Sequence, residues 1–217
     1  MSEVSAEADM LDVAALARTP LQRDPFPYVI VPAFVRASAL EAIHAAYPKI
    51  ERAGSFPVEE LTFGPAFQSL LRAVEGPAFR RAIEQKFGID LSGRPTMVTV
   101  RGQARLGDGK IHSDSKTKLI TVLIYMNGQW EAKGGRLRLL RSPDDLNDVA
   151  AEVPPDAGTL LAFKVTGNSW HGHEPFQGQR RAIQLNWVTD ESVVRREHSR
   201  HRLSAKLKRL NPFARYA

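Results

Sequence analysis

The sequence predicts a mainly β protein with flanking helices, whose core is a sandwich or jelly-roll barrel. From Thr96 onward, apolar residues alternate or run continuously over short segments separated by Gly, Pro and Asn, a pattern typical of antiparallel folds rather than of a parallel βαβ sheet. Before that point, apolar residues recur with the period of a helix. At 217 residues with 43% hydrophobic content, the chain fits one domain with a full-sized core.

The first ninety residues are expected to supply helices and one strand. Pro25 and Pro27 punctuate the chain before the strand, Ser38 is the expected N-cap of a helix, and Gly76-Pro77 interrupts the last helical zone. The expected elements are a short helix over 9–18, a strand over 28–31, a helix over 38–46 and a helical zone over 65–87.

The second half is expected to supply the strands of the barrel. Their segments are 97–101, 118–126, 136–141, 158–165 and 180–188.

The composition limits which metal ligands the chain can supply and which cell compartment is expected. The chain has no Cys, which excludes disulfides and thiolate metal ligands and leaves imidazole, carboxylate or water to hold any metal. The first twenty residues lack a basic region followed by an apolar core, and no stretch reaches 18 apolar residues. We therefore expect a cytoplasmic protein without a signal peptide or membrane span.

The net charge of +6 is concentrated at the C-terminus. Residues 194–217 hold eight Lys or Arg and one acid, so the rest of the chain is nearly neutral. Leu203, Leu207 and Leu210 share one helix face, and Pro212 would end that helix. This tail is expected to be a helix packed on the domain, or an arm that binds an anionic membrane surface or nucleic acid.

Two histidines and one aspartate suggest a metal centre. His112 and Asp114 form an H-x-D pair before an apolar run, and His171 lies 57 residues after Asp114, ahead of another strand-like run. Two imidazoles and one carboxylate form the facial triad of non-heme Fe(II) oxygenases, which leaves three coordination positions open. His173 is a competing ligand, because a shift of two residues keeps the same strand face.

The stretch from Ile111 to Val188 resembles the 2-oxoglutarate/Fe(II)-dependent dioxygenases, and within them the prolyl-4-hydroxylase-like branch. The resemblance rests on the segments IHSDSKTKLITVLIYMN, QWEAKGGRLRLL, PPDAGTLLAFKVTGNSWHGHEPF and RRAIQLNWV. It implies a double-stranded β-helix core. It also favours His171 over His173, because the family pattern places Trp or Leu before the ligand and Gly after it.

The resemblance implies a site for 2-oxoglutarate as well. Arg180 and Arg181 follow His171 by nine and ten residues, and an Arg fork can hold the distal carboxylate of the cosubstrate in two hydrogen bonds. The two side chains face opposite sides of a strand, so only one reaches the pocket, and the family spacing favours Arg180. Tyr125 stands where the family has a Tyr that contacts the cosubstrate, and Thr121 shares its strand face.

By this resemblance the protein is an Fe(II)- and 2-oxoglutarate-dependent dioxygenase that consumes O2, releases succinate and CO2, and hydroxylates an unactivated C–H bond. A prolyl residue in a protein, a small metabolite and a sugar-linked acceptor are candidate substrates. The rival hypothesis is a non-catalytic jelly-roll protein that binds a metal or a carboxylate. A cupin-type enzyme is disfavoured, because it would have H-x-H at this position.

The expected organisation is one oxygenase domain over residues 1–192. Within it, residues 1–94 would support a jelly-roll core over 95–190, and residues 193–217 would form the basic amphipathic tail.

Overall fold

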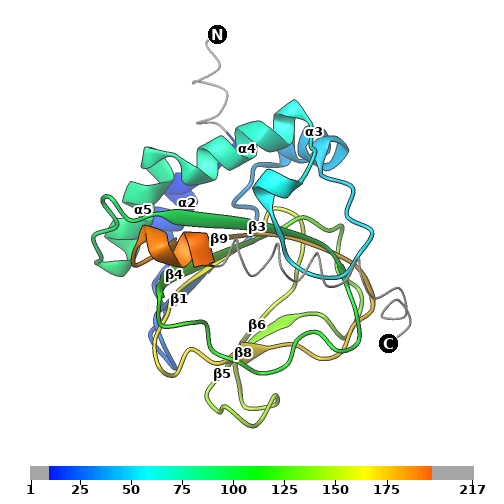
Figure 1. Cartoon of the computed structure of the whole chain (residues 1–217). Helices are drawn as coiled ribbons and strands as arrows, with labels where there is room; N and C mark the ends of the chain where they lie inside the picture. Colours follow the sequence, from blue (N-terminus) through cyan, green and yellow to red (C-terminus); the bar gives the residue numbers. More distant parts are fainter. Residues whose placement is uncertain (1–9, 197–217) are drawn as a thin grey trace.

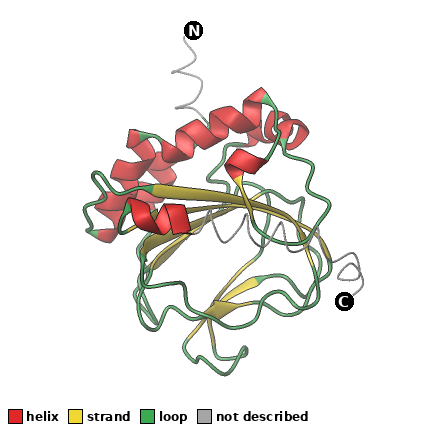
Figure 2. Cartoon of the chain, viewed as in Figure 1, coloured by secondary structure: helices red, strands yellow, loops and turns green. Residues whose placement is uncertain are grey.

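The computed structural model describes residues 10–196 and shows two antiparallel sheets that face each other, with helices covering the outer face of the larger sheet (Figures 1 and 2). The predicted mainly β jelly roll with N-terminal helices is thereby confirmed. Most of the predicted basic tail, including Leu203, Leu207 and Leu210, lies outside the described residues.

The larger sheet has six strands in the order β1-β7-β4-β9-β3-β2, and the smaller has three in the order β6-β5-β8. The strands are β1 (Tyr28–Val31), β2 (Phe56–Pro57), β3 (Thr96–Ala104), β4 (Lys118–Tyr125), β5 (Leu137–Leu140), β6 (Val149–Val153), β7 (Leu160–Lys164), β8 (His171–Gly172) and β9 (Gly178–Val188). Because β9 pairs with both β3 and β4, it lies at the centre of the larger sheet.

Helices cover one face of this sheet (Figure 1). They are α2 (Val13–Arg18), α3 (Ala37–Ala46), the 3-10 turn η1 (Val58–Glu60), α4 (Pro65–Glu75) and α5 (Pro77–Phe87). Pro65 and Pro77 open their helices, where a missing N–H costs no hydrogen bond, and Gly76 links the two. Among residues 10–196, no helix has the length and apolar character needed to cross a bilayer.

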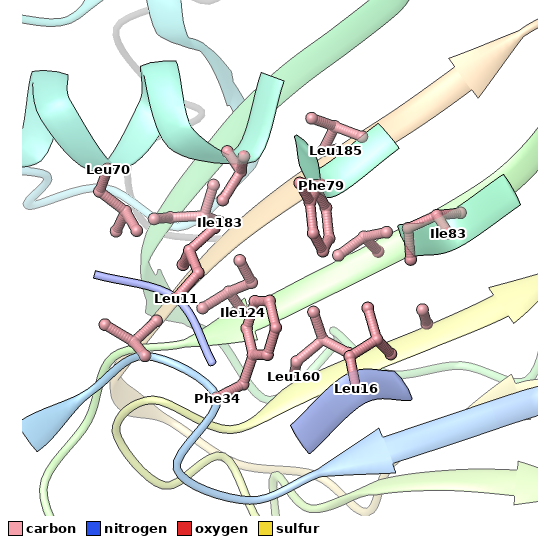
Figure 3. Packing of buried hydrophobic residues seen from close by; sticks show 14 of the residues in the cluster. Leu11, Leu16, Phe34, Leu70, Phe79, Ile83, Ile124, Leu160, Ile183 and Leu185 are labelled. Atoms are coloured by element: carbon pink, nitrogen blue, oxygen red, sulfur yellow. The ribbon is translucent and has the colours of Figure 1, made fainter. Parts of the chain in front are cut away.

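The main core fills the space between these helices and the larger sheet. Leu70 of α4 and Phe79 of α5 pack with Ile183 and Leu185 of β9 (Figure 3). Side chains alternate across a strand, so the residues between these apolar ones point to the opposite face, toward the smaller sheet. That inner face carries the polar residues of the functional site.

Several local details differ from the sequence-based expectation. Helix α2 begins at Val13, because Asp12 caps it by accepting a hydrogen bond of 2.8 Å from the Ala15 amide. The expected N-cap at Ser38 is wrong: α3 already begins at Ala37, and its cap residue Arg36 makes no side-chain capping bond.

Three strands were not anticipated. Strands β2 and β8 have only two residues each, too few to show a period, and β6 is largely not buried and so lacks a clear apolar signal.

Removal of the Phe79 ring should destabilise the protein strongly. Phe79 is fully buried, with its centroid 5.5 Å from that of Phe34 and 6.1 Å from that of Trp187. We expect Phe79→Ala to lower the free energy of unfolding by about 3–5 kcal/mol in urea denaturation, because it opens a cavity that the packed rings cannot fill. Leu106→Ala, at an exposed side chain, should change it by less than about 0.5 kcal/mol. Similar losses in the two variants would contradict this packing.

Candidate metal centre and cosubstrate pocket

Backbone pairing brings the three predicted ligands together. His112 and His171 form an antiparallel bridge in which each amide donates to the other residue's carbonyl, over 3.0 and 2.9 Å. Their ring centroids lie 4.3 Å apart, and with Asp114 they offer ligand atoms that all lie within 4.8 Å of one another. His112 lies in this isolated bridge, and Asp114 lies in the loop before β4. Neither of these two ligands therefore belongs to one of the named strands.

Both histidines are oriented by backbone carbonyls. Nδ1 of His112 lies 2.8 Å from the Lys110 carbonyl, and Nδ1 of His171 lies 2.9 Å from the Ser169 carbonyl. A carbonyl only accepts, so each Nδ1 carries the proton and each Nε2 keeps its lone pair. Metal-binding histidines use their second nitrogen in this way.

A chain of hydrogen bonds fixes the Asp114 carboxylate. The Thr121 hydroxyl donates to Oδ2 of Asp114 over 2.6 Å, and Asn186 donates to the Thr121 oxygen over 2.8 Å. Gln184 in turn donates to Asn186 over 3.2 Å. On the other carboxylate oxygen, Lys118 forms an ion pair of 2.7 Å. Thr121 therefore lines the cavity as expected, but it uses its hydroxyl on the carboxylate; its contact with the cosubstrate stays a prediction.

The protonation states suit metal binding. Burial, together with the neighbouring His112, lowers the pKa of His171 to about 4, which keeps this imidazole neutral at pH 7. Burial acts to raise the pKa of Asp114, but Lys118, His171 and the hydrogen bonds outweigh it, so the net pKa is lowered and the carboxylate is charged. Neutral imidazole and ionised carboxylate are the ligand forms that a metal requires.

The ligands open into a cavity of about 270 Å³ between the two sheets. Arg180 lines this cavity and is 6% exposed. Its Nε donates to the Gly135 carbonyl over 2.8 Å, whereas its Nη2 is buried and has no hydrogen-bond partner within the described residues. The Gly134-Gly135 turn needs glycine, because a Cβ at Gly134 would lie 2.2 Å from the Pro175 carbonyl oxygen.

Tyr125 lies beside Arg180 rather than on the cavity wall. The Arg180 guanidinium is 5.5 Å from the centroid of the Tyr125 ring. The Tyr125 hydroxyl is buried without a hydrogen-bond partner among residues 10–196, and burial raises its pKa although Arg180 acts against the shift.

Arg181 points to the other side of β9, as the alternation predicts. Its guanidinium lies over the Tyr47 ring, 5.0 Å from the centroid, and its amide donates to the Asn127 side chain over 2.7 Å. Of the two candidates, only Arg180 thus lines the cavity with the triad.

His173, the competing ligand candidate, lines the cavity wall but is outside the three-residue ligand cluster, and its Nδ1 lies 2.8 Å from the Glu174 carbonyl. The structure also places residues in the cavity that sequence reasoning did not assign to it. Arg101, Lys118, Gln184 and Asn186 were missed. Strand alternation could have indicated Arg101, Gln184 and Asn186, but only once the pairing of β3, β4 and β9 was known.

Loss of the Asp114 carboxylate should abolish metal binding with little loss of folding, because this side chain serves the site rather than the core. We expect wild-type protein to bind one Fe(II) per chain, and Asp114→Ala to bind none in anaerobic titrations. Thr121→Val should weaken Fe(II) by about tenfold or more, since partners that orient a metal ligand commonly contribute that much. Thr121→Ser, which keeps the hydroxyl, is the control. Wild-type affinity in Asp114→Ala would exclude the triad.

Acid should destabilise the metal-free protein through its buried histidines. Burial, with Arg180 nearby, lowers the pKa of His173 to about 4, below the usual 6.5. Between these values the unfolded chain binds more protons, so stability falls as the pH drops from about 6.5 toward 4. In urea denaturation of chelator-treated protein, His173→Gln should lose about 2 kcal/mol less than wild type between pH 7 and pH 5. Equal losses would mean that His173 titrates normally.

The comparisons with known proteins agree with this site. A sequence profile described as the 2OG-Fe(II) oxygenase superfamily matches residues 102–189, which include all three ligands and Arg180. No curated protein sequence matches the chain significantly.

Similar folds occur in solved structures of low sequence identity. A prolyl-4-hydroxylase from Pseudomonas putida is 19% identical, with a TM-score of 0.54 over 85% of this chain and 94% of that one. The viral collagen prolyl hydroxylase of Paramecium Bursaria Chlorella virus-1, in complex with 2OG, is 16% identical, with a TM-score of 0.50 over 75% and 96%. A 2OG-Fe(II) oxygenase family oxidoreductase from Burkholderia pseudomallei is 15% identical, with a TM-score of 0.50 over 81% and 88%. At these identities the likeness is one of fold.

The profile places the motif in a family, and the structure shows that the motif is assembled. Residues 102–189 of this chain therefore match the 2OG-Fe(II) oxygenase superfamily, and the assembled triad within them implies Fe(II) and 2-oxoglutarate as cofactor and cosubstrate.

Proposed function

We propose that this oxygenase hydroxylates an unactivated C–H bond, and that Arg180 holds 2-oxoglutarate by its distal carboxylate. The observation that carries the assignment of Arg180 is its buried, unpartnered Nη2 in the cavity that holds the metal ligands. A buried charged donor without a partner is costly, and a carboxylate is the acceptor that best fits a guanidinium fork.

The surroundings of Arg180 support this assignment. Nε is already fixed by the Gly135 carbonyl, so the fork is held in one orientation before the cosubstrate arrives. The Tyr125 hydroxyl is a second buried donor without a partner, next to the same guanidinium. Tyr125 packs against the guanidinium from behind the cavity wall, so the fork of Arg180 faces the cavity.

Each residue of the metal centre then has a defined task. The free Nε2 atoms of His112 and His171 and the Asp114 carboxylate would hold Fe(II), which, with 2-oxoglutarate and O2, supplies the oxidant as succinate and CO2 are formed. The chain from Gln184 through Asn186 and Thr121 holds the carboxylate in place.

The C–H bond that is hydroxylated can belong to a prolyl residue, a small metabolite or a sugar-linked acceptor. Two of the solved structures of similar fold are prolyl hydroxylases, which favours the first candidate only as an analogy of fold. A cavity of about 270 Å³ is below the usual range of about 300–1,000 Å³ for ligand pockets, which favours a small substrate or a single inserted side chain.

Arg180→Ala should raise the concentration of 2-oxoglutarate needed for half-maximal succinate formation by about tenfold or more, because a charge-assisted hydrogen bond contributes about 1.5–3 kcal/mol. Arg181→Ala is the matched control, since its side chain lies on the opposite face of β9. The assay is Fe(II)-dependent conversion of 2-oxoglutarate to succinate without added substrate.

If Arg181→Ala raised the required 2-oxoglutarate concentration and Arg180→Ala did not, Arg181 would be the residue that binds the distal carboxylate. A wild-type protein that binds Fe(II) and 2-oxoglutarate but forms no succinate with any tested substrate would favour the non-catalytic alternative.

A further inference from the structure

The cavity wall carries more positive charge than the metal centre and the cosubstrate require. Three cationic side chains line it, Arg101, Lys118 and Arg180, against Asp114 as the one acid among the lining residues. The wall therefore has an excess of two positive charges.

Arg101 is the lining cation that neither the metal centre nor the cosubstrate uses. It lies on β3 opposite Ala182 of β9, on the inner face that also carries Arg180. The β-bulge at Gly102 ends the alternation there, so Gln103 turns away from the cavity toward a separate surface depression.

The guanidinium of Arg101 makes no hydrogen bond or ion pair with the residues that the structure describes. Burial, and then Arg180, lower its pKa, which shows that its charge is poorly compensated. Asp108 counteracts this shift, but it forms its ion pair, of 3.3 Å, with Arg105.

Binding of Fe(II) and 2-oxoglutarate does not relieve this excess. The two positive charges of the metal cancel the two negative charges of the cosubstrate, so the wall keeps its own two. Fe(II) would also compete with Lys118 for the Asp114 carboxylate, which forms the one ion pair of Lys118 among the described residues. Uncompensated charges in a partly desolvated pocket favour an anionic ligand.

We infer that the primary substrate is a small anionic molecule, and that Arg101 binds its carboxylate or phosphate group. This inference rests on the proposed function, because it takes Arg180 as the cosubstrate clamp. Arg180, with its free Nη2, already offers a clamp to the distal carboxylate, which leaves Arg101 for a second anion. A neutral prolyl residue within a peptide would not supply that anion.

The test measures anion binding without turnover. Protein loaded with Fe(II) and saturating 2-oxoglutarate, in the absence of O2, is titrated calorimetrically with acetate, inorganic phosphate and neutral acetamide. Wild type should show one saturable site for acetate or phosphate and none for acetamide, and the tighter anion identifies the chemical group. Arg101→Gln should weaken this site at least about tenfold, the effect of losing a charge-assisted hydrogen bond. Arg105→Gln, on an exposed side chain outside the cavity, should leave it unchanged.

Three results would overturn the inference. One is the absence of anion binding by the loaded wild type, and another is equal binding by Arg101→Gln. The third is a tenfold loss of 2-oxoglutarate affinity in Arg101→Gln, which would make Arg101 a second cosubstrate clamp. Should Arg101→Gln fail to fold by circular dichroism, Arg101→Lys, which keeps the charge but loses the fork, should weaken the site by a smaller factor.

Failure of the proposed function gives a different pattern. In that case Arg180→Ala leaves 2-oxoglutarate affinity unchanged, whatever the anion titrations of the Arg101 variants show.

Discussion

The backbone bridge between His112 and His171 is the interaction on which the site depends. It joins the loop that carries H-x-D to the short strand β8, which belongs to the smaller sheet through β5. Without this pairing, the two imidazoles and Asp114 would lie on separate segments with no common metal. The two backbone hydrogen bonds of this bridge also fix the positions of the two imidazole rings relative to each other, and the Nε2 atoms of both rings stay free to bind the ion.

In the larger sheet, alternation along the strands places the core side chains on one face and the side chains of the site on the other. Along β9, Ile183 and Leu185 point to the helices, whereas Arg180, Gln184 and Asn186 point to the cavity. A strand buried on both faces would ordinarily be apolar throughout. Here one face keeps polar side chains because they hydrogen-bond one another or line a cavity for charged ligands. The exceptions are the Tyr125 hydroxyl, Arg180 Nη2 and the Arg101 guanidinium, which have no hydrogen-bond partner within residues 10–196.

The same arrangement sets the charges of the site. Burial between the sheets keeps His171 neutral, and the hydrogen bonds and Lys118 keep Asp114 ionised, so the ligands are ready for a metal at neutral pH. The excess of cations then suits anionic reactants. Local geometry thus determines which protonation forms of the metal ligands are present.

The sequence predicted the β class of the core, most of the long strands and helices, and a triad of His112 and Asp114 with a distal His, for which the family resemblance favoured His171 over His173. It could do so because a strand or helix of sufficient length imposes its period on the apolar residues, and because the H-x-D pair, the distal His and the Arg follow one another in order beside strand-like runs. It also fixed that Arg180 and Arg181 face opposite ways, since alternation is a local property of a strand.

Only the tertiary structure decided which of these arginines faces the metal ligands, and which residues share the cavity with them. Strand order and register depend on contacts between distant segments, so Arg101 of β3 comes to lie opposite Ala182, and Thr121 of β4 opposite Asn186, only when the sheet forms. For the same reason the two-residue strands β2 and β8 left no signal in the sequence. Their conformation follows from the partners they pair with, and those partners are far away in the chain.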